Sequence, residues 1–387
     1  MFCNLAHFGG CGWNSAASTW NSEFKKVKKT FMKSTYIFLA AALLLPGCSK
    51  KSADAPPNDG NVHNISTNGL PFVVTVVETD QSKEWSTLSK LALIYLEKQN
   101  YDELEKLADD GRSAEDAWPN GDWKIVPVYV GLELSASQDD SAWLARQKAM
   151  EAWIQARPES ITARVALARH LTGYAWKARG SGYANTVSDA ASRLFEERLR
   201  QAAAVLKEAK GLKAKCPVYW TTVMKLALGL GVPKDQYKRI FQEAIKEYPD
   251  YTPIYVQRGT FLQPRWYGDD GEWVVDLTKS ADKVGGEKGD MIYAQVAWAE
   301  KANSTQKNIF EDNTNLSWER VDRGWSALEK KCPDSLEAIH MHGHMAALAG
   351  DGNTAKKCLM KTGGKVSLWA WESKGEFTDF ANWAIAQ

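Results

Sequence analysis

The chain has 387 residues, 44% hydrophobic and 25% charged, which is the composition of an ordinary globular protein. Its net charge of +1 is unevenly spread, because residues 1–51 contain seven lysines and one glutamate and the remainder sums to about −5. A mildly acidic body without a dense Lys/Arg cluster argues against a nucleic-acid-binding surface.

A lipoprotein signal is indicated near the N-terminus. A basic flank precedes an apolar run from Tyr36 to Leu45, which is too short to span a bilayer that needs ~20 residues. LPGC follows and resembles the bacterial lipoprotein signal, so Cys48 is the predicted lipidation site. Ser49 after the cysteine favours a lipid-anchored, periplasm-facing protein of the outer membrane. An ordinary secretory signal with an incidental cysteine is the alternative.

The chain divides into four predicted segments. Residues 1–31 lack apolar periodicity and are interpreted as an upstream extension or an extended basic region, because Met32 begins a compact signal over 32–48. Residues 49–70 are rich in Pro, Asn, Ser and Gly, which predicts a flexible tether. Residues 71–387 form the predicted folded domain.

Helical periodicity dominates this domain. After PFVVTVV, which suits either a strand or an apolar coil, the apolar residues from Leu88 to Leu96 form one broad stripe, with a break at Asn100. Residues 187–210 show the same period, and Gly211 follows as the expected helix end. The pattern therefore predicts successive amphipathic helices.

A proline recurs between these helices, at Pro158, Pro217, Pro249 and Pro333. Proline is favoured at the first helical position because its missing N–H would lack a partner there. Pro217 and Pro249 are 32 residues apart, close to the 34 of a tetratricopeptide repeat. The prolines therefore indicate a helical repeat.

Two repeat registers test this interpretation. One places Phe241 and Ala244 at the expected Phe and Ala positions, and the other places Gly343 and Ala355 where paired helices approach closely. The predicted fold class is therefore all-α, a tetratricopeptide-like α-solenoid of degenerate helical hairpins.

After the signal only Cys216, Cys332 and Cys358 remain, so at most one disulfide can form. Cys216 and Cys332 each precede a proline, which favours a repeated structural position over a bonded pair. No CxxC pattern is present, and this argues against a thiolate zinc site.

Three segments resemble the domain-of-unknown-function family 4034: the region around WKARGSGYANTV, then PRWYG, then GGEKGDMIYAQVAW. The resemblance extends over roughly residues 85–385. It implies a tetratricopeptide-like helical fold in bacterial proteins that are often secreted or lipid-anchored. The family brings no established activity, so it assigns no catalytic residue and no cofactor.

The segment HMHGH raises a metal hypothesis. On a helix His340 and His344 share one face, with Glu337 one turn earlier, so these three could ligate zinc. The alternative, which we favour, is a helix with polar groups facing solvent or a groove and His342 at a packing position.

Familiar catalytic patterns are missing, since the chain has no GxxxxGK[ST], no GxSxG and no HExxH. Asp269 and Asp270 precede an amphipathic stripe that starts at Trp273. We therefore interpret this acidic pair as a helix cap, which lowers a carboxyl's proton affinity, the reverse of what a general acid needs.

Two loops combine arginine with aromatic residues. Arg179 and Tyr183 lie in one, and Arg265, Trp266 and Tyr267 lie in the other. If the loops adjoin on one face, guanidinium forks and ring faces would suit a carboxylate or a sugar. The alternative is structural, with the arginines paired to nearby carboxylates and the rings packed under the loops.

The favoured function is a lipid-anchored cell-envelope scaffold that binds a protein or peptide and catalyses nothing. The alternative is a carbohydrate- or peptidoglycan-binding module, or a weak hydrolase, that uses the two arginine–aromatic loops and takes a glycan or small molecule. No cofactor and no nucleic-acid partner are expected.

Overall fold

The computed structural model describes residues 64–65, 70–113, 117–118, 120–180, 182, 186–301, 308–313 and 315–387. Within these residues, helices make up nearly all of the regular structure, and the all-α prediction is confirmed. Residues 1–31, the predicted signal with Cys48, most of the predicted tether, and Tyr183 lie outside them. None of the described helices is both long and apolar enough to cross a membrane.

The elements follow one another as a string of helices with three short strands. They are β1 (Asn64–Ile65), β2 (Val74–Val76), α2 (Asp80–Glu97), α3 (Tyr101–Asp110), α4 (Ile125–Leu132), α5 (Asp140–Ala156), α6 (Ile161–Arg179), α7 (Asp189–Lys210), α8 (Pro217–Leu230), α9 (Lys234–Glu247), α10 (Thr252–Phe261), α11 (Glu272–Val284), α12 (Gly286–Lys301), α13 (Ile309–Asp312), α14 (Trp318–Lys331), α15 (Leu336–Leu348), α16 (Gly352–Lys361), β3 (Lys365–Val366), the 3-10 helix η3 (Leu368–Ala370) and α17 (Lys374–Ala386).

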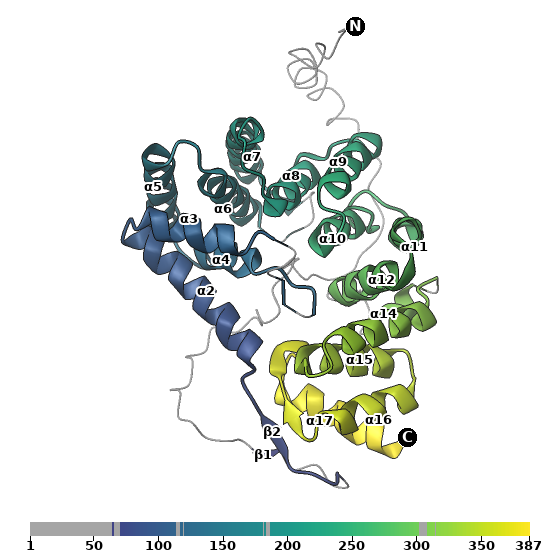
Figure 1. The fold of residues 1–387 in the computed structure, drawn as a ribbon. Coiled ribbons are helices and arrows are strands. Elements are labelled where there is room, and N and C mark those ends of the chain that lie inside the picture. The colour runs from purple at the N-terminus through teal and green to yellow at the C-terminus, as the bar shows by residue number, and fades with distance from the viewer. Residues whose placement is uncertain are drawn as a thin grey trace, which may run out of the picture.

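The helices stack as a tetratricopeptide-like solenoid (Figure 1). Helices α4, α6, α8, α10 and α12 contact one another in succession and form an inner row. Helices α7, α9 and α11 each bridge two neighbours of that row from outside. Each hairpin buries its apolar face against the next, so a single core runs the length of the chain.

The predicted repeat positions are core positions. Phe241 and Ala244 are buried between α9 and its neighbours. A Cβ placed on Gly343 would lie 3.0 Å from the Cβ of Cys358, so α15 and α16 approach too closely for a side chain there. Ala355 is fully buried at the same interface. Small residues therefore set the spacing of this hairpin, as the repeat register predicts.

The recurring prolines take a different position from the predicted one in three of four cases. Pro217 is the first residue of α8. The other three lie in the turns before α6, α10 and α15, which begin after Ser160, Tyr251 and Ser335. The hydroxyls of Ser160 and Ser335 accept a backbone N–H of the first turn, so serine is the cap and proline the turn residue.

The solenoid closes on itself. Strand β2, formed by the PFVVTVV segment, pairs in parallel with β3 near the C-terminus (Figure 1). The hydroxyl of Thr79, at the start of α2, donates to the Glu337 carboxylate on α15. The rings of Trp85 and Trp369 meet edge to face, with centroids 5.2 Å apart. The first and last elements therefore cover each other's apolar faces, a role that dedicated capping repeats fill in open solenoids.

The three cysteines of the domain are buried and free. Cys216 is the residue before α8, whereas Cys332 follows the last residue of α14. The prediction that these two are not bonded to each other is confirmed.

Candidate binding site on the inner face

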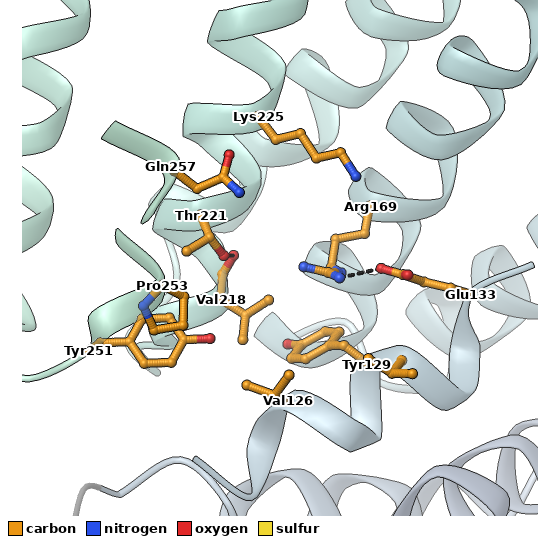
Figure 2. Close-up of a pocket in the computed structure, with 11 residues that line it drawn as sticks. Val126, Tyr129, Glu133, Arg169, Val218, Thr221, Lys225, Tyr251, Pro253 and Gln257 are labelled. Atoms are coloured by element: carbon orange, nitrogen blue, oxygen red, sulfur yellow. Dashed lines mark hydrogen bonds and ion pairs between the residues drawn. The ribbon is translucent and has the colours of Figure 1, made fainter. Parts of the chain in front are cut away.

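Four helices of the inner row turn one face each toward a common pocket (Figure 2). On α8 the contributing residues are Val218, Thr221 and Lys225, spaced three and four apart and therefore on one stripe. On α10 they are Pro253 and Gln257, again four apart. The spacing follows from helical geometry, so the pocket is a product of the stacking itself.

The remaining walls come from α4, α6 and the start of α10. Helix α4 supplies Val126, Tyr129, Val130 and, just after its last turn, Glu133; α6 supplies Arg169, and Tyr251 precedes α10. The cavity has a volume of about 50 Å³. A single water needs roughly 10–15 Å³ by the same measure, so the space suits a group of a few heavy atoms.

Two cations share one carboxylate in this pocket. Arg169 forms an ion pair with Glu133, and Figure 2 shows Lys225 reaching toward the same pair. Burial acts to lower the pKa of Arg169, but the Glu133 carboxylate outweighs it, and the pKa is raised. Burial lowers the pKa of Lys225, with Glu133 opposing this effect and Arg169 reinforcing it. The pocket therefore carries an excess positive charge that its own residues do not neutralise.

Polar atoms in the pocket also lack partners. Within the part of the chain that the structure describes, Nε of Arg169 and Oε1 of Gln257 are buried without a hydrogen bond. No hydrogen bond or ion pair to Lys225 is formed among those residues either. A buried polar group without a partner costs about 1–3 kcal/mol, which a ligand that hydrogen-bonds to it would relieve.

The apolar side of the pocket is rigid. The Tyr129 hydroxyl lies 3.3 Å from Sγ of Cys216, and the Arg169 guanidinium lies over the Tyr129 ring, 5.7 Å from its centroid. This contact and the Glu133 pair fix the guanidinium plane on two sides. A fixed fork of N–H donors beside an ammonium is a geometry that recognises carboxylates.

Sequence reasoning missed this pocket. Its signal is a single charge inside an apolar helix: Lys225 is the one ionisable residue of the α8 sequence PVYWTTVMKLALGL besides the Tyr219 phenol. A lone lysine there is as compatible with an exposed edge of the helix as with a pocket. Its neighbours Arg169 and Gln257 are far away in the sequence, so only the stacking brings them together.

Arg179, the last residue of α6, lies beside the second predicted arginine–aromatic loop, whereas Tyr183 is outside the described residues. The rings of Trp176 and Trp266 meet edge to face, with centroids 5.6 Å apart. The Arg179 guanidinium lies 5.4 Å from the Trp176 ring centroid. Burial raises the pKa of Tyr267, and the Arg179 charge opposes that rise, which places these side chains near each other.

The arginines and Tyr267 of this cluster are engaged within the protein, whereas Nε1 of Trp176 and Nε1 of Trp266 are buried without a hydrogen bond among the described residues. Arg179 donates to the carbonyls of Gly180 and Gly182. The Tyr267 hydroxyl donates to the Leu228 carbonyl, and its ring stacks on Phe261. Burial lowers the pKa of Arg265, with the Glu300 carboxylate opposing it. These contacts give the loops a structural role that accounts for much of their composition.

The interpretation of Asp269 and Asp270 as helix caps is wrong. Helix α11 begins after Gly271, whose left-handed backbone conformation makes the turn, and no side chain accepts a bond at that position. Glu272 instead reaches back and accepts the N–H of Asp269. Glu272 and Asp269 both pair with Lys234 of α9. Glycine occupies the position before α11 because the backbone there has a positive φ, which glycine adopts at little cost.

The residues of the predicted zinc trio are directed to different partners. Nε2 of His340 lies 3.2 Å from the Lys365 carbonyl, and Nδ1 of His344 lies 3.0 Å from the Ala370 carbonyl. Glu337 accepts the Thr79 and Ser367 hydroxyls. Burial lowers the pKa of His340 to about 4 and that of His344 to about 3. The trio therefore ties α15 to the ends of the chain.

These features define an all-α protein of stacked helical hairpins with a cationic pocket on its inner face. Residues 93–247 match the model of the family described as domain of unknown function (DUF4034), so this segment carries that family's domain. The match includes WKARGSGYANTV and most of the pocket, and it ends before PRWYG and GGEKGDMIYAQVAW. It is narrower than the resemblance over 85–385. No curated protein matches the chain.

Proposed function

We propose that the chain is a lipid-anchored cell-envelope protein whose inner-face pocket binds a carboxylate of a protein or peptide partner. The observation that carries this proposal is the pair of cations, Arg169 and Lys225, facing a single carboxylate in a cavity with unpartnered polar atoms. A second carboxylate would bring the pocket to neutrality and supply acceptors for those donors.

The size of the pocket favours a carboxylate over larger anions. A volume of about 50 Å³ is small, and a carboxylate head group fills less of it than a phosphate monoester, which brings five heavy atoms and a second charge. The Gln257 amide lies across the pocket from Arg169 (Figure 2), where its N–H can donate to the second oxygen of the ligand. The acidic side chain or C-terminus of a peptide meets these requirements.

The solenoid supports a peptide or protein as the source of that carboxylate. Stacked helical hairpins present a long inner surface on which an extended chain can lie, with one pocket selecting one side chain. The predicted lipidation of Cys48 supports a location at the envelope surface, where such a scaffold would meet its partners.

A pair of peptide pools tests the pocket. One pool contains random peptides with Asp and Glu and a free C-terminus, and the other replaces them with Asn, Gln and a C-terminal amide. The wild-type protein should retain peptides from the first pool only. Lys225→Met should lower retention about tenfold, equivalent to the loss of ~1.4 kcal/mol. Lys246→Met, an exposed lysine of α9, is the matched control and should bind as the wild type does.

Retention of both pools alike, or equal retention by the Lys225→Met variant, would remove the pocket from the proposal.

The lipid anchor has a separate test. Cys48→Ser should abolish fatty-acid labelling of the protein in a bacterial host, and labelling that survives this substitution would contradict the lipid anchor.

A glycan ligand at the arginine–aromatic loops is the second candidate, because the structure brings Trp176, Trp266 and Arg179 into contact. Affinity for purified peptidoglycan fragments should fall in Arg265→Ala and Trp266→Ala if these loops bind sugar. Undiminished affinity in both variants, each checked for native helix content, would exclude the loops.

A further inference from the structure

A second cluster of buried polar groups lies far from the pocket, where α14, α15 and α16 meet. It consists of Glu329 on α14, His342 on α15 and Cys358 on α16. One ligand atom of each, a carboxylate oxygen, an imidazole nitrogen and a thiol sulfur, lies within 4.8 Å of the others. All three residues are buried. The three atoms are the types that zinc and its neighbours prefer.

A neutral His342 cannot donate to both of its carboxylate partners. Its Nε2 lies 2.9 Å from Oδ1 of Asp322, and its Nδ1 lies 2.6 Å from Oε1 of Glu329. A neutral imidazole carries one N–H, and an ionised carboxylate only accepts. If Nε2–H donates to Asp322, the Nδ1 lone pair faces a carboxylate oxygen. Two acceptors at this separation require a proton or a metal cation between them.

The arrangement of Asp322 matches the outer partner of a metal-bound histidine. Histidines that ligate metals commonly donate their other ring N–H to a carboxylate, which fixes the tautomer and the ring orientation. Asp322 holds His342 in this manner and leaves Nδ1 directed at Glu329 and toward Cys358. Asp322 is itself partly exposed at the surface.

One of the separations already matches a tetrahedral site, and a second has to lengthen. With metal bonds of ~2.0–2.3 Å, tetrahedral ligand atoms stand roughly 3.3–3.8 Å apart. Sγ of Cys358 is 3.8 Å from Oε1 of Glu329, which already fits. The Glu329–His342 contact at 2.6 Å has to widen by about 1 Å, which a small carboxylate rotation supplies.

Charge balance favours a divalent ion over a monovalent one. The Lys361 ammonium lies 2.5 Å from Oε2 of Glu329 and stays outside the three ligand atoms. A divalent cation together with the Cys358 thiolate, the carboxylates of Glu329 and Asp322 and the Lys361 ammonium sums to zero. The buried cluster would therefore hold the ion without an uncompensated charge.

We propose that Glu329, His342 and Cys358 form a zinc-type metal site, with Asp322 as the partner that orients His342. The fourth coordination position would take water. Because the ligands come from three successive helices, the ion would clamp the C-terminal hairpins at the end where the solenoid closes. This site is independent of the carboxylate pocket, and either can fail without the other.

Cobalt(II) is a direct probe of this site, because thiolate ligation gives it a near-ultraviolet charge-transfer band and tetrahedral geometry gives intense visible bands. The tag-free full chain, stripped with a chelator, should develop both bands with one equivalent of cobalt, and one equivalent of zinc should remove them. Zinc should also raise the melting temperature of the wild-type chain.

Matched cysteine variants locate the signal. Cys358→Ser should lose the charge-transfer band and the zinc-dependent rise in melting temperature. Cys332→Ser should keep both, since this buried thiol donates to the Leu328 carbonyl and lies outside the cluster. Asp322→Asn should weaken the affinity for cobalt about 10–100-fold while keeping the band, as expected for an orienting partner.

Three results would overturn the proposal. A folded wild-type chain that takes up no metal shows that a proton, and not an ion, joins His342 to Glu329. Cobalt bound without a thiolate band places the metal elsewhere. A band that survives Cys358→Ser, in a variant with wild-type circular dichroism, assigns the sulfur to another cysteine.

Discussion

Helices α8 and α15 both place ionisable residues inside largely apolar sequences, and the structure treats them differently. Glu337, His340 and His344 of α15 each contact a hydroxyl or carbonyl of another element. Lys225 of α8 meets no such partner within the described part of the chain and lies in a cavity beside Arg169.

The difference separates architecture from a binding site. A buried polar group with a partner contributes to specifying the fold. If it is removed, its partner stays buried without a hydrogen bond, which destabilises the protein. A partly buried cation without a partner is a cost to the free protein that a ligand can relieve. The following predictions test whether these two regions differ in this way, from the largest expected effect to the smallest.

The largest effect is expected at the C-terminal cluster. Glu329→Ala removes the carboxylate shared by His342 and Lys361. It should lower the free energy of unfolding by about 3–5 kcal/mol, because it leaves buried groups unpaired. Urea unfolding in the presence of a chelator measures this change. Glu319→Ala, at an exposed position of α14, is the control and should stay within about 0.5 kcal/mol of wild type.

A pH effect is expected from His170 on α6, next to the pocket cation Arg169. Burial lowers the pKa of His170 to about 4, and its Nε2 contacts the Trp143 carbonyl. With an unfolded pKa of ~6.5, the unfolded chain binds more protons below that value, so stability falls as the pH drops. By pH 4 this group should account for a loss of about 3 kcal/mol.

His170→Gln isolates that contribution, since other buried histidines titrate in the same direction. The unfolding free energy of the variant should depend less steeply on pH between 6.5 and 4 than that of wild type. Parallel curves for the two proteins would show that His170 is protonated equally in both states and would contradict the burial argument.

Lysine-to-methionine substitutions at two positions should change the free energy of unfolding in opposite directions. Lys225→Met replaces a cation that has no hydrogen bond among the described residues by an apolar chain of similar length, and should raise the unfolding free energy by about 1 kcal/mol. Lys361→Met removes a partner of Glu329 and should lower it by about 1 kcal/mol. A destabilised Lys225→Met variant would mean that the ammonium is satisfied in the free protein.

Much of the fold could be predicted from the sequence because it rests on local periodicity. The apolar stripes, the small residues Gly343 and Ala355 and the buried Phe241 follow from the spacing of one hairpin. The closing of the solenoid on itself could not be predicted. It depends on the pairing of β2 with β3, which comes almost three hundred residues later in the chain. A short apolar segment carries no information about so distant a partner.

The candidate sites show the same division. The composition of one loop singles out Arg265, Trp266 and Tyr267 in the sequence, and the structure brings this loop against Trp176. The carboxylate pocket depends on Lys225, the single charge of an apolar helix, and on Arg169, one of several basic residues of α6. Residues that are close together in the sequence can be recognised as a cluster from composition. The pocket residues come together only when the helices stack.

The smallest effect concerns Asp269 and Asp270, which sequence reasoning assigned as caps. Because Gly271 makes the turn and Glu272 accepts the N–H of Asp269, both aspartates should tolerate alanine within about 0.5 kcal/mol. Glu272→Ala should cost about 1 kcal/mol, since it removes that bond and the contact with Lys234. Urea unfolding of the three variants ranks them. A larger loss in Asp269→Ala or Asp270→Ala than in Glu272→Ala would restore the capping interpretation and count against the glycine turn.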